Sequence, residues 1–213
     1  MEIAVIGGTG YAGAAVVAEA ARRGHQVRSV SRNRPAAQAK GVAHLAGSAA
    51  DPAFLEAAVA EVDAVVSSLS PRGPMLGQVR RVNQQLIALA ETLGFRLGVI
   101  LGGGSLAVAP GGPLLVDTPD FPDFVRPESL EMSEVLDDLR ASPAGVDWFG
   151  VSPAVGFGAH APGERLGRYR LGGDTVLADA AGNSFVSAPD LALAIVDELE
   201  RPAHKRQRFT VAY

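Results

Sequence analysis

Two patterns of hydrophobic and polar residues alternate along the chain. Short runs of consecutive apolar residues lie at 3–6, 27–30, 42–46, 64–67, 96–101 and 146–151. Such runs are typical of strands that are buried on both faces of a parallel sheet. Between them, apolar residues recur with a helical period at 11–23, 52–61, 75–93 and 127–140. This alternation predicts an α/β fold, a doubly wound parallel sheet with helices on both faces.

Capping residues support the boundaries of several predicted elements. Asp51 precedes a proline and is typical of a helix N-cap, whereas Gly94 stands where a helix C-terminal cap belongs. Ser187 lies three residues before an aspartate, a variant of the capping box that opens a helix over 191–199. The last residues, 208–213, read as a closing strand.

Length and composition indicate one domain over residues 1–213, because the chain is 47% hydrophobic and only 20% charged. Two long segments rich in glycine and proline, 102–126 and 152–173, follow predicted strands. Ligands of open α/β sheets bind beyond the carboxyl ends of the strands. We therefore expect both segments to build a pocket for a small-molecule substrate.

Charge and composition argue against several other classes of function. The net charge of −4 and the scattered basic residues argue against nucleic acid as a partner. The chain has no cysteine, its four histidines form no pattern of metal ligands, and no apolar run approaches the ~18 residues that span a membrane. We expect a cytoplasmic protein without a metal or membrane partner, either a monomer or a homodimer.

The segment Gly7-Gly-Thr-Gly-Tyr-Ala-Gly13 lies between the first predicted strand and the first predicted helix. In this context the spacing of its glycines is typical of a Rossmann-type dinucleotide-binding loop. The glycines permit a tight turn, a close approach of the pyrophosphate, and close packing of the helix on the strand. The helix N-terminus then offers free N–H groups to the phosphates.

The end of the second predicted strand indicates which dinucleotide binds. An NAD-binding fold usually places a carboxylate there, on the adenosine ribose. This chain instead has Arg32 and Arg34, and guanidinium groups hold a 2′-phosphate by charge-assisted hydrogen bonds. The sequence therefore favours NADP(H) over NAD(H). The alternative is that both arginines only solvate a surface turn.

Several segments of the chain resemble a known protein group. They include the glycine loop, the basic end of the second strand and the tail from Ser187 to Tyr213, and three further segments. The three further segments are Leu114-Leu-Val-Asp-Thr-Pro-Asp-Phe-Pro122, Tyr169-Arg-Leu-Gly-Gly-Asp174 and Arg206-Gln-Arg-Phe-Thr-Val211. The chain resembles the atypical NAD(P)-binding branch of the short-chain dehydrogenase/reductase superfamily. Within that branch it is similar to NADH-flavin reductase-like and NAD(P)-dependent epimerase-like proteins.

The resemblance adds Ser48, Ser67, Ser68, Leu69, Pro153 and Ala154 to the predicted cofactor site. Ser48 departs from the family, since relatives commonly have an aspartate there, near the adenine. The predicted cofactor-binding residues are therefore Gly7, Gly8, Thr9, Gly10, Tyr11, Ala12, Gly13, Arg32, Arg34, Ser48, Ser67, Ser68, Leu69, Pro153 and Ala154.

The Tyr-x-x-x-Lys pair of ordinary short-chain dehydrogenases is missing. The chain has tyrosines at 11, 169 and 213 and lysines at 40 and 205, so none are four residues apart. Carbonyl reduction by the usual route needs such a proton donor. Reduction of a flavin or quinone asks mainly for proximity and orientation, because the acceptor delocalises the charge. The sequence thus predicts an NADPH-dependent oxidoreductase, with FMN or FAD as a potential substrate.

Two side chains are candidates for a catalytic role. Ser105 falls near the family's usual catalytic serine and is placed to hydrogen-bond an acceptor carbonyl, or it is only a turn hydroxyl. His160 is the one histidine on a predicted pocket loop. Two other functions stay open. One is an NADP(H)-binding redox sensor with little catalysis, and the other is a sugar-nucleotide epimerase or dehydratase.

Overall fold

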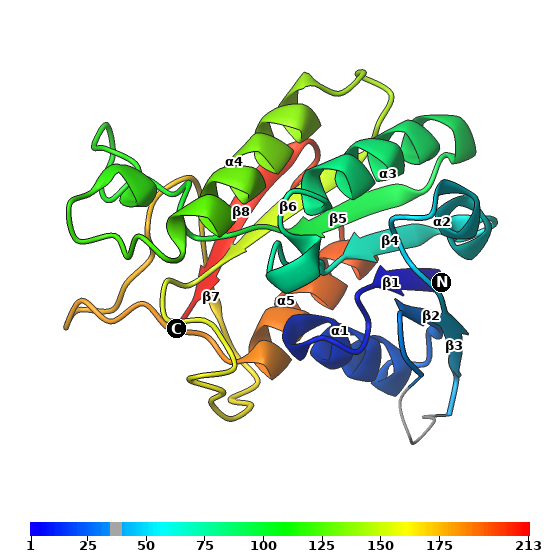
Figure 1. Cartoon of the computed structure of the whole chain (residues 1–213). Helices are drawn as coiled ribbons and strands as arrows, with labels where there is room; N and C mark the ends of the chain where they lie inside the picture. Colours follow the sequence, from blue (N-terminus) through cyan, green and yellow to red (C-terminus); the bar gives the residue numbers. More distant parts are fainter. Residues whose placement is uncertain (35–39) are drawn as a thin grey trace.

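The apolar runs form the strands of one eight-stranded sheet in the computed structural model, which describes residues 1–34 and 40–213 (Figure 1). The strands are β1 (Glu2–Ile6), β2 (Gln26–Ser31), β3 (Val42–Ala46), β4 (Ala64–Ser67), β5 (Arg96–Ile100), β6 (Trp148–Pro153), β7 (Arg170–Gly172) and β8 (Gln207–Ala212). Their order is β3-β2-β1-β4-β5-β6-β8-β7. All neighbours are parallel except β7, which runs antiparallel to β8.

Helices cover both faces of this sheet, which confirms the predicted fold class. Helices α1 (Tyr11–Arg22) and α5 (Ala188–Glu200) pack on one face, and α2 (Pro52–Val59), α3 (Val79–Leu93) and α4 (Arg126–Ala141) pack on the other. Two short 3₁₀ turns, η1 (Gly73–Met75) and η2 (Leu115–Asp117), precede α3 and α4. Trp148 and Phe149 are adjacent in β6 and fully buried, and they pack in the core on opposite faces of the sheet.

The predicted caps are confirmed. The carboxylate of Asp51 accepts hydrogen bonds from two backbone N–H groups of α2, and the Ser187 hydroxyl accepts one from Asp190 at the start of α5. Gly94 ends α3 with a φ of 78°. Some predicted boundaries were wrong. Helix α3 begins at Val79 rather than at 75, because η1 and the left-handed residue Gly77 precede it. Helix α5 begins at Ala188 rather than at 191, and β6 lies two residues later than predicted.

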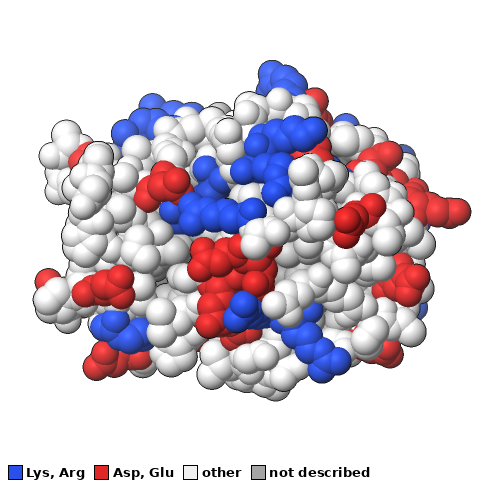
Figure 2. All heavy atoms as spheres, turned by 90° about the horizontal axis from the view of Figure 1, so that it is seen from above, with Lys and Arg blue, Asp and Glu red and all other residues white. Residues whose placement is uncertain are grey.

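Ion pairs tie α4 to α3 on the outside of the molecule. The Arg80 guanidinium donates to both carboxylate oxygens of Asp138, at 2.8 and 2.9 Å, and to Glu134 at 2.9 Å. These hydrogen bonds hold the pKa of Asp138 below its usual value. Figure 2 looks onto this side of the protein, where basic and acidic side chains lie next to one another. The pairing fixes α4, whose first turn faces the site described below.

The crossover between β1 and β4 creates a crevice at the carboxyl ends of the strands. From β1 the chain winds outward to β2 and β3, then returns to β4 on the other side. Ligands bind at such a reversal in open α/β sheets. The long segments 102–126 and 152–173 both begin at this edge, as predicted, although the second also contains β7. No helix within the described chain has the length and apolar character needed to cross a membrane.

Candidate functional site

The glycine loop is fixed to the sheet by backbone hydrogen bonds. The N–H groups of Gly7 and Gly8 both donate to the carbonyl of Val30, at 2.8 and 3.1 Å, and Gly10 N–H donates to Gly7 at 2.9 Å. Gly7 has a φ of +86°, and a Cβ added at Gly13 would overlap the carbonyl oxygen of Gly7. The loop is therefore a cradle that only glycines permit, as close approach to a pyrophosphate requires.

The first turn of α1 is open to an anion. Its N-cap is Gly10, which has no side chain to cap the helix, and no acidic residue lies in the first turn. Unpaired N–H groups and the positive end of the helix dipole therefore meet at this point. Thr9, Tyr11 and Ala12 line the adjoining cavity. These residues fit the two phosphates of a dinucleotide.

A cavity of about 600 Å³ extends from this loop along the carboxyl ends of the central strands. The predicted cofactor-binding residues that line it are Gly7, Thr9, Gly10, Tyr11, Ala12, Arg32, Ser48, Ser68, Leu69, Pro153 and Ala154. The predicted residues outside its lining are Gly8, Gly13, Arg34, Ser67, Ser105 and His160. We call the part bounded by residues 7–12, 30–33, 47–49 and 68–69 the nucleotide half.

Arg32 and Ser48 lie at the outer end of the nucleotide half. Arg32 and Arg34 both follow β2 and are exposed, but Arg32 lines the cavity and Arg34 does not. The Ser48 hydroxyl accepts a hydrogen bond from the N–H of Ala50 at 3.3 Å, in the turn before α2. Arg32 is thus the arginine placed to meet a group at the adenosine ribose.

The other part of the cavity, which we call the acceptor half, is mainly apolar. Its side chains come from η1, the 102–126 segment, α4 and the segment after β6, and they were not predicted individually. They include Met75, Leu101, Leu115, Phe121, Val125, Glu128, Ser129, Met132, Val155 and Phe157. At its rim, Arg72 donates to Glu128 at 2.7 Å and so links the segment after β4 to α4. In the sequence, the acceptor half was indicated only by the two long segments that were expected to form a substrate pocket.

The two candidate catalytic residues lie away from the cavity lining. Ser105 is 9% exposed, and its hydroxyl accepts a hydrogen bond of 2.8 Å from Arg208 of β8. Arg208 also pairs with Asp174, and burial lowers its pKa. Ser105 therefore anchors a buried arginine. His160 is exposed, at the tip of a turn in which Ala161 N–H donates to Gly158.

A latch joins the glycine loop to the segment after β6. The Tyr11 hydroxyl donates to the carbonyl of Pro162 at 3.0 Å, and its ring packs against Phe157 with 5.3 Å between centroids. Burial raises the pKa of Tyr11, so the phenol remains protonated and able to donate. The Asp190 carboxylate holds the same segment by accepting the N–H groups of Leu166 and Gly167, at 2.7 and 2.9 Å.

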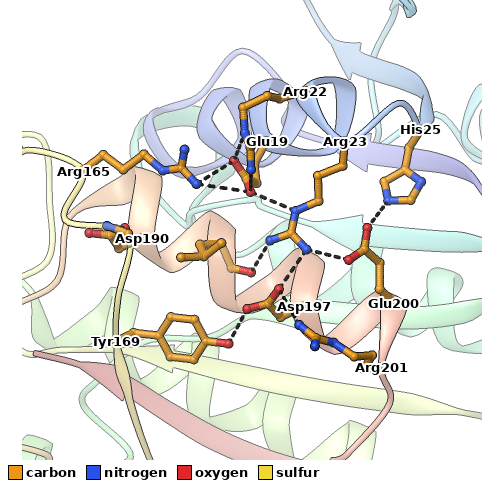
Figure 3. A network of polar contacts seen from close by, with 12 residues as sticks. Glu19, Arg22, Arg23, His25, Arg165, Tyr169, Asp190, Asp197, Glu200 and Arg201 are labelled. Atoms are coloured by element: carbon orange, nitrogen blue, oxygen red, sulfur yellow. Dashed lines mark hydrogen bonds and ion pairs between the residues drawn. The ribbon is translucent and has the colours of Figure 1, made fainter.

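Figure 3 shows the ionic network beneath this segment, at the far end of α1. Glu19 is 6% exposed and accepts hydrogen bonds from Arg22 and Arg23 at 2.7 and 2.9 Å, while Arg165 approaches to 3.4 Å. The hydrogen bond from Arg22 is the main reason that the pKa of Glu19 falls to about 2. Arg23 also pairs with Asp197 of α5 at 2.8 Å. The network connects α1, α5 and the latched segment.

Comparisons with known proteins agree with this geometry. Residues 7–202 match the sequence profile of a family described as NAD(P)H-binding. A structure from Burkholderia pseudomallei, named "putative exported protein", is 40% identical, with complete coverage of both chains and a TM-score of 0.86. The resemblance to reductase-like and epimerase-like proteins is confirmed by two further structures.

Both of these structures are 32% identical to this chain and match all of it. One is a "putative epimerase" from Bacteroides thetaiotaomicron, with 96% of that chain covered and a TM-score of 0.89. The other is a "putative NADH-flavin reductase" from Streptococcus pneumoniae, with 99% of that chain covered and a TM-score of 0.82.

Proposed function

The chain belongs to this NAD(P)H-binding family, and from that premise we propose that it is an NADPH-dependent oxidoreductase that reduces a flat conjugated acceptor, such as a flavin or quinone. One observation carries the proposal. One cavity extends from the glycine loop past the carboxyl ends of the central strands into the apolar acceptor half. The acceptor half is lined by residues that follow β4, β5 and β6 and by residues of α4. A dinucleotide and a second planar molecule would therefore meet in one cavity.

The residues of the chain bind and orient rather than transfer protons. Residues 7–12 would hold the pyrophosphate, and Leu69, Pro153 and Ala154 would border the nicotinamide. When bound, a reduced nicotinamide supplies a hydride to the acceptor. The apolar walls around Met132 and Phe157 would exclude water from the contact between nicotinamide and acceptor. The rate of hydride transfer would then come from proximity and orientation of the two rings.

Preference for NADPH rests on Arg32. It lines the nucleotide half at the carboxyl end of β2, where other folds of this type carry a carboxylate. A guanidinium there would form charge-assisted hydrogen bonds with a 2′-phosphate. The neighbouring residues of the cavity wall, Ser31 and Asn33, leave this end without a competing acidic side chain.

The composition of the cavity wall favours an acceptor that needs no strong acid. Of the lining residues that the structure describes, Tyr11 carries the one phenol, its hydroxyl is engaged by Pro162, and no lysine is present. The neighbour from Streptococcus pneumoniae carries a flavin reductase name, in keeping with this chemistry. A reduced flavin or quinone can take its proton from water.

Stopped-flow measurement of NADPH oxidation tests the proposal. The purified protein is mixed with NADPH and with FMN, riboflavin or menadione, and the initial rate is followed over a range of acceptor concentrations. We expect saturation with at least one acceptor. Rates equal to the protein-free blank with every acceptor would reject the reductase.

A redox sensor is the second candidate, since the Tyr/Lys pair is absent. It predicts tight NADPH binding with no turnover in the same assay. Epimerase chemistry, suggested by the name of the Bacteroides relative, predicts that a bound nicotinamide is reduced only transiently by a nucleotide-sugar. A cytoplasmic location and a monomeric or dimeric state stay predictions, and the Burkholderia relative is named an exported protein.

A further inference from the structure

Helix α4 brings one buried hydroxyl to the acceptor half. Ser129 lies in the first turns of α4, is 9% exposed and lines the cavity. Its carbonyl accepts a hydrogen bond from Ser133, but its hydroxyl has no protein partner in the described part of the chain. The hydroxyl oxygen is not fully enclosed by protein, so a ligand in the acceptor half can reach it and form a hydrogen bond with it.

The backbone opposite Ser129 is kept free of side chains. A Cβ added at Gly104 would lie 2.7 Å from the Ser129 Cβ and 2.9 Å from its hydroxyl oxygen. Gly102 and Gly103, which precede it, line the cavity as well. Residues 102–104 thus form a strip of backbone without side chains, in which Gly104 packs directly against Ser129. A Cβ added at Gly102 or Gly103 would have no contact closer than 3.6 Å, so these two residues leave space for a ligand at the end of β5.

Phe121 provides an aromatic surface next to this strip. Its ring lines the cavity, and its tip atom would be 3.6 Å from a Cβ at Gly104. Arg126 holds the ring in place: its guanidinium lies 5.5 Å from the ring centroid and donates to the carbonyls of Val116 and Phe121. The ring is therefore a fixed platform, which stacking on a conjugated system requires.

We propose that Ser129 donates a hydrogen bond to a carbonyl oxygen of a planar acceptor that stacks on Phe121. This assignment rests on the proposed function and narrows its substrate class to conjugated carbonyl compounds. As the acceptor gains a hydride and the nicotinamide is oxidised, negative charge gathers on the carbonyl oxygen beside Ser129. A proton from water then completes the reduced acceptor. Ser129 takes the role that the sequence suggested for Ser105.

Binding titrations of the protein saturated with NADP⁺ test the assignment without turnover. Riboflavin, which has ring carbonyls, is followed by quenching of its fluorescence, and anthracene, a planar tricyclic hydrocarbon without hydrogen-bonding atoms, by its own fluorescence. Ser129→Ala should weaken riboflavin binding about tenfold and leave anthracene binding unchanged, because only riboflavin loses a hydrogen bond. Phe121→Leu should weaken both ligands by a similar factor, because both lose the stacking surface.

Ser133→Ala is the matched control, since it removes the same group one turn further along α4, outside the cavity lining. It should change neither ligand. NADPH affinity and the circular dichroism spectrum of every variant show whether the fold is kept. If Ser129→Ala weakens both ligands equally, or neither, or if the wild-type protein binds no riboflavin, the assignment is overturned.

Turnover separates this inference from the proposed function. If riboflavin binding depends on Ser129 but no acceptor supports NADPH oxidation, the proposed reductase function is rejected and the assignment of Ser129 to the binding site stands. NADPH oxidation that proceeds equally well in Ser129→Ala, with an unchanged KM for menadione, would keep the reductase and overturn the role of Ser129.

Discussion

The two halves of the cavity are built in different ways. The nucleotide half presents mainly backbone from one short stretch, residues 7–12, which is held by hydrogen bonds to the carbonyl of Val30. The acceptor half presents side chains from η1, the 102–126 segment, α4 and the segment after β6. A site made of local backbone is encoded by a motif, whereas a site made of distant side chains exists only after folding. The difference explains why the cofactor is easier to assign than the acceptor.

Their anchors differ as well. The glycine loop is fixed by main-chain hydrogen bonds, which depend on the spacing of the glycines and not on particular side chains. The acceptor half depends on individual side chains, among them Arg126, Tyr11 and Asp190. We therefore expect the two halves to respond separately to substitution, and four changes test that separation.

The largest effect is expected at Gly13. A Cβ there would overlap the Gly7 carbonyl, so Gly13→Ala must displace the loop from α1. We expect NADPH affinity to fall by more than about a hundredfold and the free energy of unfolding by about 1–3 kcal/mol. Calorimetry and denaturant titration measure the two quantities. Gly145→Ala is the control, because a Cβ at Gly145 meets nothing within 4 Å. Unchanged NADPH binding in Gly13→Ala would contradict the view that the nucleotide half depends on the backbone of the glycine loop.

Arg32→Ala comes next. Losing charge-assisted hydrogen bonds to a 2′-phosphate should weaken NADPH binding by about 10- to 100-fold and leave NADH binding unaltered. Calorimetric titration with both dinucleotides measures the shift. Arg34→Ala removes the same charge two residues away, outside the cavity lining, and should have little effect. Equal losses for NADPH and NADH would contradict a role in phosphate recognition.

Replacing Glu19, at the far end of α1, should lower the stability of the fold and leave ligand binding unchanged. Its pKa of about 2 lies below the unfolded value near 4.5, so the ionised form stabilises the fold above pH 4.5. That contribution is lost as the pH falls from about 4.5 to about 2. At pH 7 we expect Glu19→Gln to lower the free energy of unfolding by about 1–3 kcal/mol, allowing for the exposed side chain of Arg22.

Denaturant unfolding at several pH values between 7 and 3 measures this effect. The gap between wild type and Glu19→Gln should narrow as the pH falls. Glu56→Gln, at an exposed position of α2, should show no such gap. A gap that stays constant down to pH 3 would mean that the network does not depend on the charge of Glu19.

The smallest effect is expected at Tyr11, where the two halves meet. Tyr11→Phe removes the hydrogen bond to Pro162 but keeps the packing on Phe157. One lost hydrogen bond is worth about 0.5–1.5 kcal/mol, which corresponds to a rise of about 2- to 10-fold in KM. Steady-state kinetics with NADPH and menadione as varied substrates show which half relies on the latch. No change in either KM would mean that the latch holds nothing needed for binding.

The strands, the helices and the glycine loop were predictable because each has a local signal. Residues 42–46 and 64–67, for example, were predicted as strands with the bounds that the structure shows. The exception is β7, a three-residue strand at the edge of the sheet that pairs with β8 and has no apolar pattern of its own. Ser105 shows the same limit at the site. Its position near the family's usual catalytic serine suggested a place in the cavity, but Arg208, over one hundred residues later, engages its hydroxyl.

The sequence by itself determined the fold class, the dinucleotide loop and the missing Tyr/Lys pair. These depend on period, on the conformational freedom of glycine and on residue identity, which can all be read along the chain. Only the tertiary structure decided which side chains face the acceptor. Ser129 lies in α4 and Phe121 in the segment before it, and the packing of both against the loop after β5 sets them beside Gly104. Such a contact arises from the packing of helix on sheet, and no local pattern records it.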